Sequence, residues 1–119
     1  MHIIRRIKWF IQRGLRGYAD CDVWDVSDYL ISIILPMLKQ LKKDQSGYPC
    51  THTRRGCHCE QNWDRALKEM IEGWEAAERL EADNYPRDIK LWWSERLKDE
   101  RIFRHKMRTF AKYFFALWD

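Results

Sequence analysis

The sequence is poor in the residues that interrupt helices, and it lacks the short motifs that mark the commonest enzymes. Of its 119 residues, five are glycine and three are proline. It contains no glycine-rich phosphate loop, no G-x-S-x-G elbow and no H-E-x-x-H pair. These absences exclude the usual active sites of phosphate-loop nucleotide hydrolases, serine hydrolases and zinc proteases. Composition and motifs alone therefore do not name an activity.

The sequence also lacks a long hydrophobic run. Its most apolar window, residues 29–41, contains Pro36 and Lys39 and is shorter than the roughly 20 residues that a bilayer span needs. The first ten residues are basic but include no apolar stretch of signal-peptide length. Four cysteines are too few for a disulfide-bonded scaffold of this size. We therefore expect a protein of a reducing cytoplasm, without a membrane span.

The chain does contain enough apolar material for a folded domain. Hydrophobic residues make up 45% of it and charged residues 34%, which argues against a disordered tail. Apolar residues recur at helical spacing in four segments, and no run alternates as a strand would. We predict an all-α fold, a bundle of four or five helices forming a single domain over residues 1–119. The predicted helices cover residues 3–15, 26–43, about 62–83 and 88–118, with a long loop at 44–61.

The second and fourth predicted helices carry further expectations. In residues 26–43, apolar side chains occupy almost every side. This helix should therefore be central in the bundle or covered by a partner chain, as in a homo-oligomer. Asp25 or Ser27 can cap its start, and Asn62 can cap the third helix. In residues 88–118 one apolar stripe follows another, so we expect a break near Lys98–Arg101, although no glycine or proline marks it.

Charge is arranged in blocks along the chain. Residues 1–19 contain five basic residues and no acidic one, whereas residues 60–84 contain eight acidic and three basic residues. This pattern predicts that the basic first helix pairs with the acidic third helix across a solvated face. The alternatives are contact of the first helix, with its Trp9 and Phe10, with nucleic acid or with an anionic membrane surface.

Cysteine and histidine are concentrated in the loop at 44–61. Cys50, His52, Cys57 and Cys59 could supply the four ligands of a tetrahedral zinc site, with His58 in reserve. The common C-x-x-C spacing is missing, and the loop would have to fold tightly to close the site. The alternatives are a plain reduced loop and redox or disulfide chemistry. A structural zinc is thus one of three hypotheses, and no other cofactor is predicted.

A second cluster joins aspartates to arginines and aromatic residues. Arginine next to an aromatic face suits a nucleotide-type ligand, because the cation binds phosphate and the ring stacks on the base. The candidate ligand-binding residues are Arg13, Arg16, Tyr18, Asp20, Asp22, Trp24 and Tyr48. The alternatives are that Asp20, Asp22, Asp25 and Asp28 only cap a helix and pair with nearby arginines, or that they hold a divalent cation for a metal-dependent hydrolase.

Several ordered strings of the sequence resemble a family of small uncharacterised proteins of tailed bacteriophages and prophages. The strings are Arg16–Trp24 (RGYADCDVW), Tyr29–Leu30, Pro36-x-Leu38, Gly47–Pro49 (GYP), Trp63–Trp74 (WDRALKEMIEGW) and Phe110–Trp118 (FAKYFFALW). The chain departs from the family pattern in the cysteine-rich loop after Pro49 and at Trp74, where phenylalanine is more usual. The resemblance implies a small helical protein that acts in the cytoplasm of an infected bacterium, and it implies no activity.

These observations predict a non-enzymatic phage or prophage binding protein. Small phage proteins of this kind are often counter-defence or host-modulating factors, so we expect the chain to bind a host protein or to sequester a nucleotide-type signal. The alternatives are a nucleic-acid-binding accessory protein that uses the basic first helix, and the metal-dependent hydrolase that uses residues 20–28.

Overall fold

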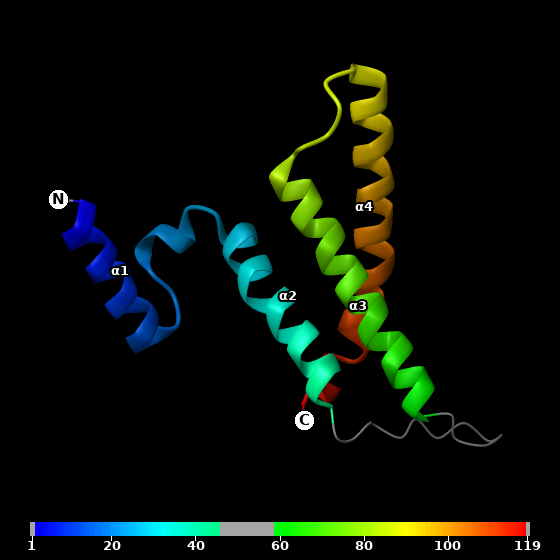
Figure 1. Cartoon of the computed structure of the whole chain (residues 1–119), viewed down its shortest axis with the longest axis horizontal. Coiled ribbons are helices and arrows are strands. Elements are labelled where there is room, and N and C mark those ends of the chain that lie inside the picture. Colours follow the sequence, from blue (N-terminus) through cyan, green and yellow to red (C-terminus); the bar gives the residue numbers. More distant parts are fainter. Residues whose placement is uncertain (1, 46–58, 119) are drawn as a thin grey trace. The chain divides into compact units, whose positions relative to one another are not determined.

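The computed structural model describes residues 2–45 and 59–118, and every regular element in these ranges is helical (Figure 1). The all-α prediction is therefore confirmed, with four α-helices and two short 3₁₀ helices in the described ranges. The elements are α1 (His2–Arg16), η1 (Asp20–Val23), α2 (Val26–Asp44), α3 (Cys59–Ala82), α4 (Ile89–Lys112) and η2 (Phe114–Ala116).

The chain forms two compact units, Met1–Leu30 and Ile31–Asp119. We call them the N-terminal unit and the C-terminal unit. The first contains α1, η1 and the first turn of α2, and the second contains the rest of α2 with α3, α4 and η2. The prediction of a single domain over residues 1–119 stays a prediction.

The N-terminal unit turns sharply after α1. Gly17 has a φ of +86°, and its N–H donates to the carbonyl oxygen of Arg13 at 2.9 Å. A residue in this left-handed conformation commonly ends a helix, and glycine adopts it without strain. The Tyr29 hydroxyl donates to the Gly17 carbonyl oxygen. The turn therefore ends α1 and brings η1 back against it.

The start of α2 is capped as the sequence predicted. Of the two candidates, Asp25 takes the role, since its carboxylate accepts hydrogen bonds from the Asp28 N–H at 3.2 Å and from the Ser27 hydroxyl at 2.9 Å. A carboxylate in this position satisfies N–H groups that have no partner within the helix. Pro36 lies inside α2 without ending it.

The core of the C-terminal unit lies between α2, α3 and α4. Leu67 and Met70 of α3 are fully buried. Edge-to-face aromatic pairs join α3 to α4 and to the residue after it, with ring centroids 5.4 Å apart for Trp74 and Phe110 and 5.6 Å apart for Trp63 and Tyr113. Such pairs add to the hydrophobic gain of burial. The apolar stripe that the sequence showed on the third helix is therefore the centre of this core.

The α2 helix buries one face only. Ile31, Leu35 and Leu38 are buried in the core, whereas Leu30 and Met37 are 43% and 57% exposed. The prediction that this helix is central in the bundle is therefore wrong, because α3 and α4 pack mainly against each other and α2 meets them from one side. Coverage of the exposed residues by a partner chain stays a prediction.

The turn between α3 and α4 is held by a buried carboxylate. Asp99 of α4 is 6% exposed and accepts hydrogen bonds from the Arg79 guanidinium at 2.9 and 3.1 Å and from the Tyr85 hydroxyl at 2.6 Å. Burial raises the pKa of Asp99, but these two donors outweigh it and leave the pKa below its ordinary value. Asp88 caps α4 by accepting from the N–H groups of Lys90 and Leu91.

Three predicted helix boundaries are wrong. The α4 helix continues through residues 98–101, because this stretch contains no helix-breaking residue and Asp99 has partners on α3 and in the turn. It ends instead at Lys112, before η2. The α3 helix begins at Cys59 and not at Asn62. A capping residue inside a helical run is a weak start signal when the residues before it can also be helical.

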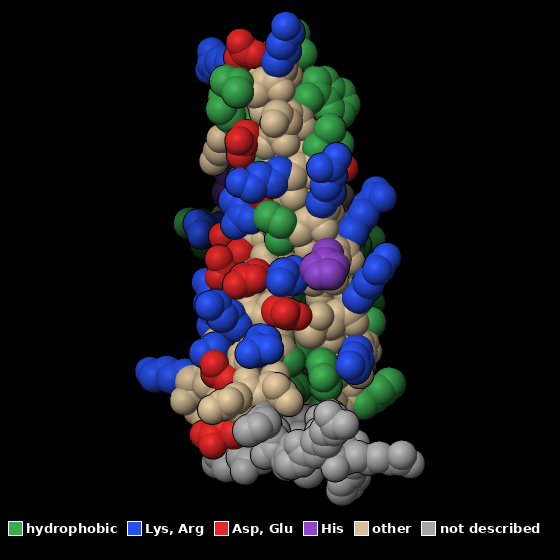
Figure 2. Space-filling view, turned by 90° about the vertical axis from the view of Figure 1, so that its right-hand side faces the viewer, with side chains coloured by type: hydrophobic (Ala, Val, Ile, Leu, Met, Phe, Trp, Pro, Cys, Tyr) green, Lys and Arg blue, Asp and Glu red, His purple; other side chains and the backbone are tan. Residues whose placement is uncertain are grey.

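Charged residues cover much of the solvent face of the C-terminal unit. Figure 2 shows basic and acidic side chains interspersed on that face. The acidic side of α3 pairs with α2 and α4, through Lys42 and Asp64 at 3.0 Å and through Lys106, which lies 3.8 and 3.5 Å from Glu69 and Glu72. The prediction that the first helix pairs with the acidic third helix stays a prediction, because the two helices belong to different units.

Candidate functional site

The aspartate cluster pairs with the arginines of α1. The Arg13 guanidinium makes a two-point contact with Asp22, with Nε 2.9 Å from Oδ2 and Nη2 2.6 Å from Oδ1. The Ala19 N–H donates to the same carboxylate at 2.8 Å. The Arg13 hydrogen bonds and the Ala19 N–H hold the pKa of Asp22 at about 2, and Arg13 in turn has a raised pKa. Two-point pairing of this kind fixes geometry as well as charge.

A second contact of α1 is centred on Asp20. The Gln12 amide donates to Asp20 Oδ2 at 2.9 Å, and the Asp20 N–H donates back to Gln12 Oε1 at 3.0 Å. Arg16 Nη2 lies 2.5 Å from Asp20 Oδ1. The hydrogen bonds from Gln12 and Arg16 lower the pKa of Asp20 to about 2. The sequence reasoning expected pairing between these arginines and aspartates, but it missed Gln12, since an isolated glutamine carries no signal.

The predicted ligand-binding residues are only partly brought together. Arg16, Tyr18 and Asp22 line one pocket of about 340 Å³, beside Val26 and Tyr29. Among the other candidates, Arg13 does not line this pocket and is paired with Asp22, and Asp20 is bonded to Gln12. Trp24 packs edge-to-face on Trp9 at 5.9 Å, and Tyr48 lies outside the described residues.

The charges of that pocket are already balanced. Arg16 is paired with Asp20, and its guanidinium carbon also lies 4.4 Å from the centroid of the Tyr18 ring. A phosphate entering the pocket would therefore compete with a carboxylate for Arg16 and would meet the negative charge of Asp22. The nucleotide pocket stays a prediction that this geometry does not favour.

The predicted zinc ligands lie largely outside the described part of the chain. Cys50, His52 and Cys57 are not described, and Cys59 begins α3 with its side chain outside the description. Within the described residues, no three side chains of histidine, cysteine, aspartate or glutamate come together to hold a metal ion. The four aspartates of residues 20–28 are therefore not gathered into one metal site, since Asp20 and Asp22 face α1 and Asp25 caps α2.

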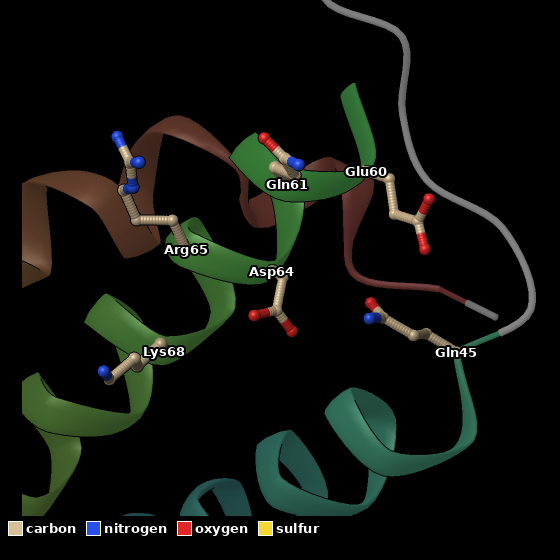
Figure 3. Close-up of a pocket in the computed structure, with 6 residues that line it drawn as sticks. All are labelled: Gln45, Glu60, Gln61, Asp64, Arg65 and Lys68. Atoms are coloured by element: carbon tan, nitrogen blue, oxygen red, sulfur yellow. The ribbon is translucent and has the colours of Figure 1, made fainter. Parts of the chain in front are cut away.

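A polar pocket of about 640 Å³ lies where α2 ends and α3 begins. In Figure 3, the side chains of Gln45 and Asp64 point toward one another across it, and Glu60 lies beside them. Gln45 Oε1 is buried without a hydrogen-bond partner in the described structure. Lys42 already pairs with Asp64. The pocket is therefore polar, and its lining combines carboxylates and amides with the basic side chains of Arg65 and Lys68.

An apolar groove of about 730 Å³ lies between α2 and the C-terminal residues of the same unit. Eight of its ten lining residues are apolar, and the two polar ones are Gln40 and Asp44. Met37, Phe114 and Trp118 are each more than half exposed. The lining is Ile34, Met37, Leu38, Gln40, Leu41, Asp44, Phe110, Phe114, Leu117 and Trp118. We call this feature the C-terminal groove.

The α1 helix contacts η1 and its flanks through its polar face. Residues 8, 9, 12, 13 and 16 recur at helical spacing and make these contacts, and Trp9 and Gln12 are the only half-buried residues of the helix. The opposite face carries Ile3, Ile4, Ile7, Phe10, Ile11 and Leu15, each between 51% and 84% exposed. We call it the outer face of α1. Sequence periodicity identified this stripe as one face of a helix.

Comparison with protein-family models, with curated proteins and with solved structures finds no match. The resemblance to phage and prophage proteins therefore stays a prediction. Among the described residues, no helix combines the length and the apolar character needed to cross a bilayer.

Proposed function

We propose that the chain is a non-enzymatic binding protein of phage or prophage origin, which modulates its host cell by occupying a host protein. The observation that carries the proposal is the C-terminal groove, whose lining is apolar apart from Gln40 and Asp44. Apolar concave sites with a few polar groups are the usual form of binding sites. A host-modulating or counter-defence role follows from the phage resemblance and from contact with a host target.

The chemistry of the groove suits an amphipathic helix. Side chains of α2 form one wall, and Phe110, Phe114 and Trp118 form the other. A partner helix can place its apolar residues between these walls, in the mode by which many regulatory proteins hold a peptide. Asp44 at the end of α2 would meet a basic residue beside the apolar stripe. We therefore assign the groove a host helix with an apolar stripe and a flanking lysine or arginine.

The other predicted functions have less support in the geometry. A nucleotide-type signal or a nucleic acid needs free cations, and Arg13 and Arg16 are both paired with aspartates. A metal-dependent hydrolase needs several acidic ligands at one point, and within the described residues the aspartates of residues 20–28 serve different contacts. Binding of a protein partner requires neither free cations nor a cluster of acidic metal ligands.

The test replaces exposed residues of the groove and measures capture of a host protein. The full chain, immobilised, should retain a specific protein from a bacterial lysate, which is then identified, purified and titrated. Met37→Glu and Trp118→Ala should each weaken the measured affinity by about tenfold or more, since exposed methionine and tryptophan are typical contact anchors. Phe115→Ala is the matched control, because Phe115 is 93% exposed and does not line the groove.

Three outcomes would contradict the proposal. The first is an affinity that the groove variants leave unchanged. The second is a nucleotide released by heating and found by mass spectrometry, which Arg16→Ala abolishes. The third is a homodimer in sedimentation that Met37→Glu dissociates, with no captured protein, because a second copy would then be the occupant of the groove.

A further inference from the structure

We propose that the outer face of α1 binds the surface of an anionic lipid bilayer, with the helix lying in the plane of the interface. This proposal is independent of the C-terminal groove. It rests on three observations of the N-terminal unit, namely the direction in which α1 is attached, the charge around its apolar face, and its length.

The attachment of α1 turns its apolar face outward. The polar face is held by Arg13 on Asp22 and by Gln12 and Arg16 on Asp20. Because these contacts use the side of the helix that water would otherwise solvate, they leave Ile7 and Phe10 53% and 78% exposed. An ordinary surface helix is oriented the other way, with its apolar stripe toward the protein. An apolar face presented by a helix that is itself anchored is a contact surface.

The charge around this face fits an anionic partner. Of the five basic residues in residues 1–19, Lys8, Arg13 and Arg16 pair with Asp20 and Asp22, so Arg5 and Arg6 supply the charge that would meet an anionic partner. Arg6 and Lys8 flank the outer face on its two sides by helical geometry. Among the described residues, neither Arg5 nor Arg6 forms an ion pair. Long basic side chains beside an apolar stripe can reach the lipid headgroups while the stripe enters the acyl boundary.

The length of α1 decides how it would lie. Its 15 residues extend for only about 22 Å. The basic residues recur along the whole helix, so neither end is apolar enough to insert. Strong amphipathicity combined with a highly charged polar face is the signature of a helix that lies on a membrane and does not cross it.

Other occupants fit this face less well. Two copies of α1 joined through their outer faces would bring two sets of basic residues together, which costs electrostatic energy. A nucleic acid would approach the basic face, where Asp20 and Asp22 already bind Arg16 and Arg13, and it would leave the apolar face in water. An anionic bilayer uses the apolar residues and the flanking basic residues at once.

The experiment is co-sedimentation of the full chain with lipid vesicles. Vesicles of phosphatidylcholine with phosphatidylglycerol should bind the chain, vesicles of phosphatidylcholine alone should bind it far less, and salt should weaken the binding. The double variant Ile7→Glu with Phe10→Glu should reduce partitioning into the vesicles by about tenfold or more, because two charges replace two apolar side chains at the lipid interface. Arg6→Gln should reduce it by about fivefold at low salt, because Arg6 flanks the outer face.

The matched control is Phe115→Glu, which places a charge on an equally exposed apolar residue of the C-terminal unit and should leave vesicle binding unchanged. Far-ultraviolet circular dichroism should show the same helical content for all variants, because the replaced side chains lie outside the contacts that hold α1.

Three results would overturn the proposal. One is equal binding to anionic and neutral vesicles, or binding that Ile7→Glu with Phe10→Glu leaves intact. Another is absence of vesicle binding together with a dimer that the same double variant dissociates. The last is binding to duplex DNA that Arg5→Gln weakens and the double variant does not change.

Discussion

The two units of this chain use amphipathic helices in opposite ways. In the C-terminal unit, α3 buries Leu67 and Met70 in the apolar core, and its Glu69 and Glu72 pair with Lys106 of α4. In the N-terminal unit, α1 is held by ion pairs and amide hydrogen bonds, and its isoleucines face outward. The comparison shows that an apolar stripe predicts a helix but not the direction in which the helix packs.

The difference follows from what each helix can pack against. The α3 stripe meets apolar side chains of α2 and α4, such as Leu35 and Phe110. The segment that returns against α1 is Asp20–Val23, and it offers two carboxylates in place of an apolar surface. Charge-assisted hydrogen bonds are the strongest interaction available there. The basic face of α1 therefore turns inward.

The largest expected effect is on the C-terminal core. Leu67→Ala should lower the free energy of unfolding by about 2–5 kcal/mol, because the Leu67 side chain is fully buried in the core and its removal leaves a cavity. Ile7→Ala in α1 is the matched control and should change it by less than about 0.5 kcal/mol. Urea unfolding followed by circular dichroism measures both. Equal effects of the two substitutions would mean that the outer face of α1 is buried in solution.

A second comparison uses one glycine from each unit. A Cβ at Gly73 would lie 2.7 Å from Lys106 Cβ, so Gly73→Ala should push α3 and α4 apart and cost about 1–3 kcal/mol. A Cβ at Gly14 of α1 meets nothing within 4 Å. Gly14→Ala should therefore stabilise the N-terminal unit, by up to about 1 kcal/mol, through its higher helix propensity. Opposite signs in thermal unfolding are expected, and a destabilising Gly14→Ala would contradict the open surface at that position.

The smallest expected effect is a pH dependence of the N-terminal unit. Because the pKa of Asp22 is lowered from 3.8 to about 2 in the folded chain, its contribution to stability is present above pH 4. That contribution is lost as the pH falls through about 2, when the carboxylate is protonated and Arg13 loses its partner. Asp20 follows the same direction.

Residue-resolved amide exchange measures this effect separately in the two units. Protection of α1 should fall between pH 4 and pH 2, before that of the α3 residues around Met70. Asp22→Asn removes the titrating group and should make the protection of α1 lower and less dependent on pH. If α1 and α3 lost protection together, the polar contacts would not be what holds α1.

Much of the fold could be predicted from the sequence because helical periodicity is a local property. The Trp63, Leu67 and Met70 stripe is the core of α3, and Asp25 caps α2 as its place before an apolar run suggested. The predicted break at Lys98–Arg101 was wrong because a second stripe does not require a new helix. Asp99 stabilises the continuous α4 through Arg79 and Tyr85, and Arg79 lies 20 positions away in the chain.

The candidate sites were less predictable. The Arg13–Asp22 pair could be expected from the neighbouring blocks of charge, but the two-point geometry and the role of Gln12 depend on how the chain turns at Gly17. The C-terminal groove joins residues as far apart as Ile34 and Trp118. No spacing rule connects such residues, so only the folded chain brings them together.

The amino-acid sequence by itself determined where the helices form, since the spacing of apolar residues, the scarcity of glycine and proline, and the capping side chains act over a few residues each. The tertiary structure alone decided which face of α1 points outward and which residues share a groove. The physical reason is that both depend on partners distant in sequence, and a helix with one apolar and one charged face can satisfy either face, depending on what the rest of the fold places beside it.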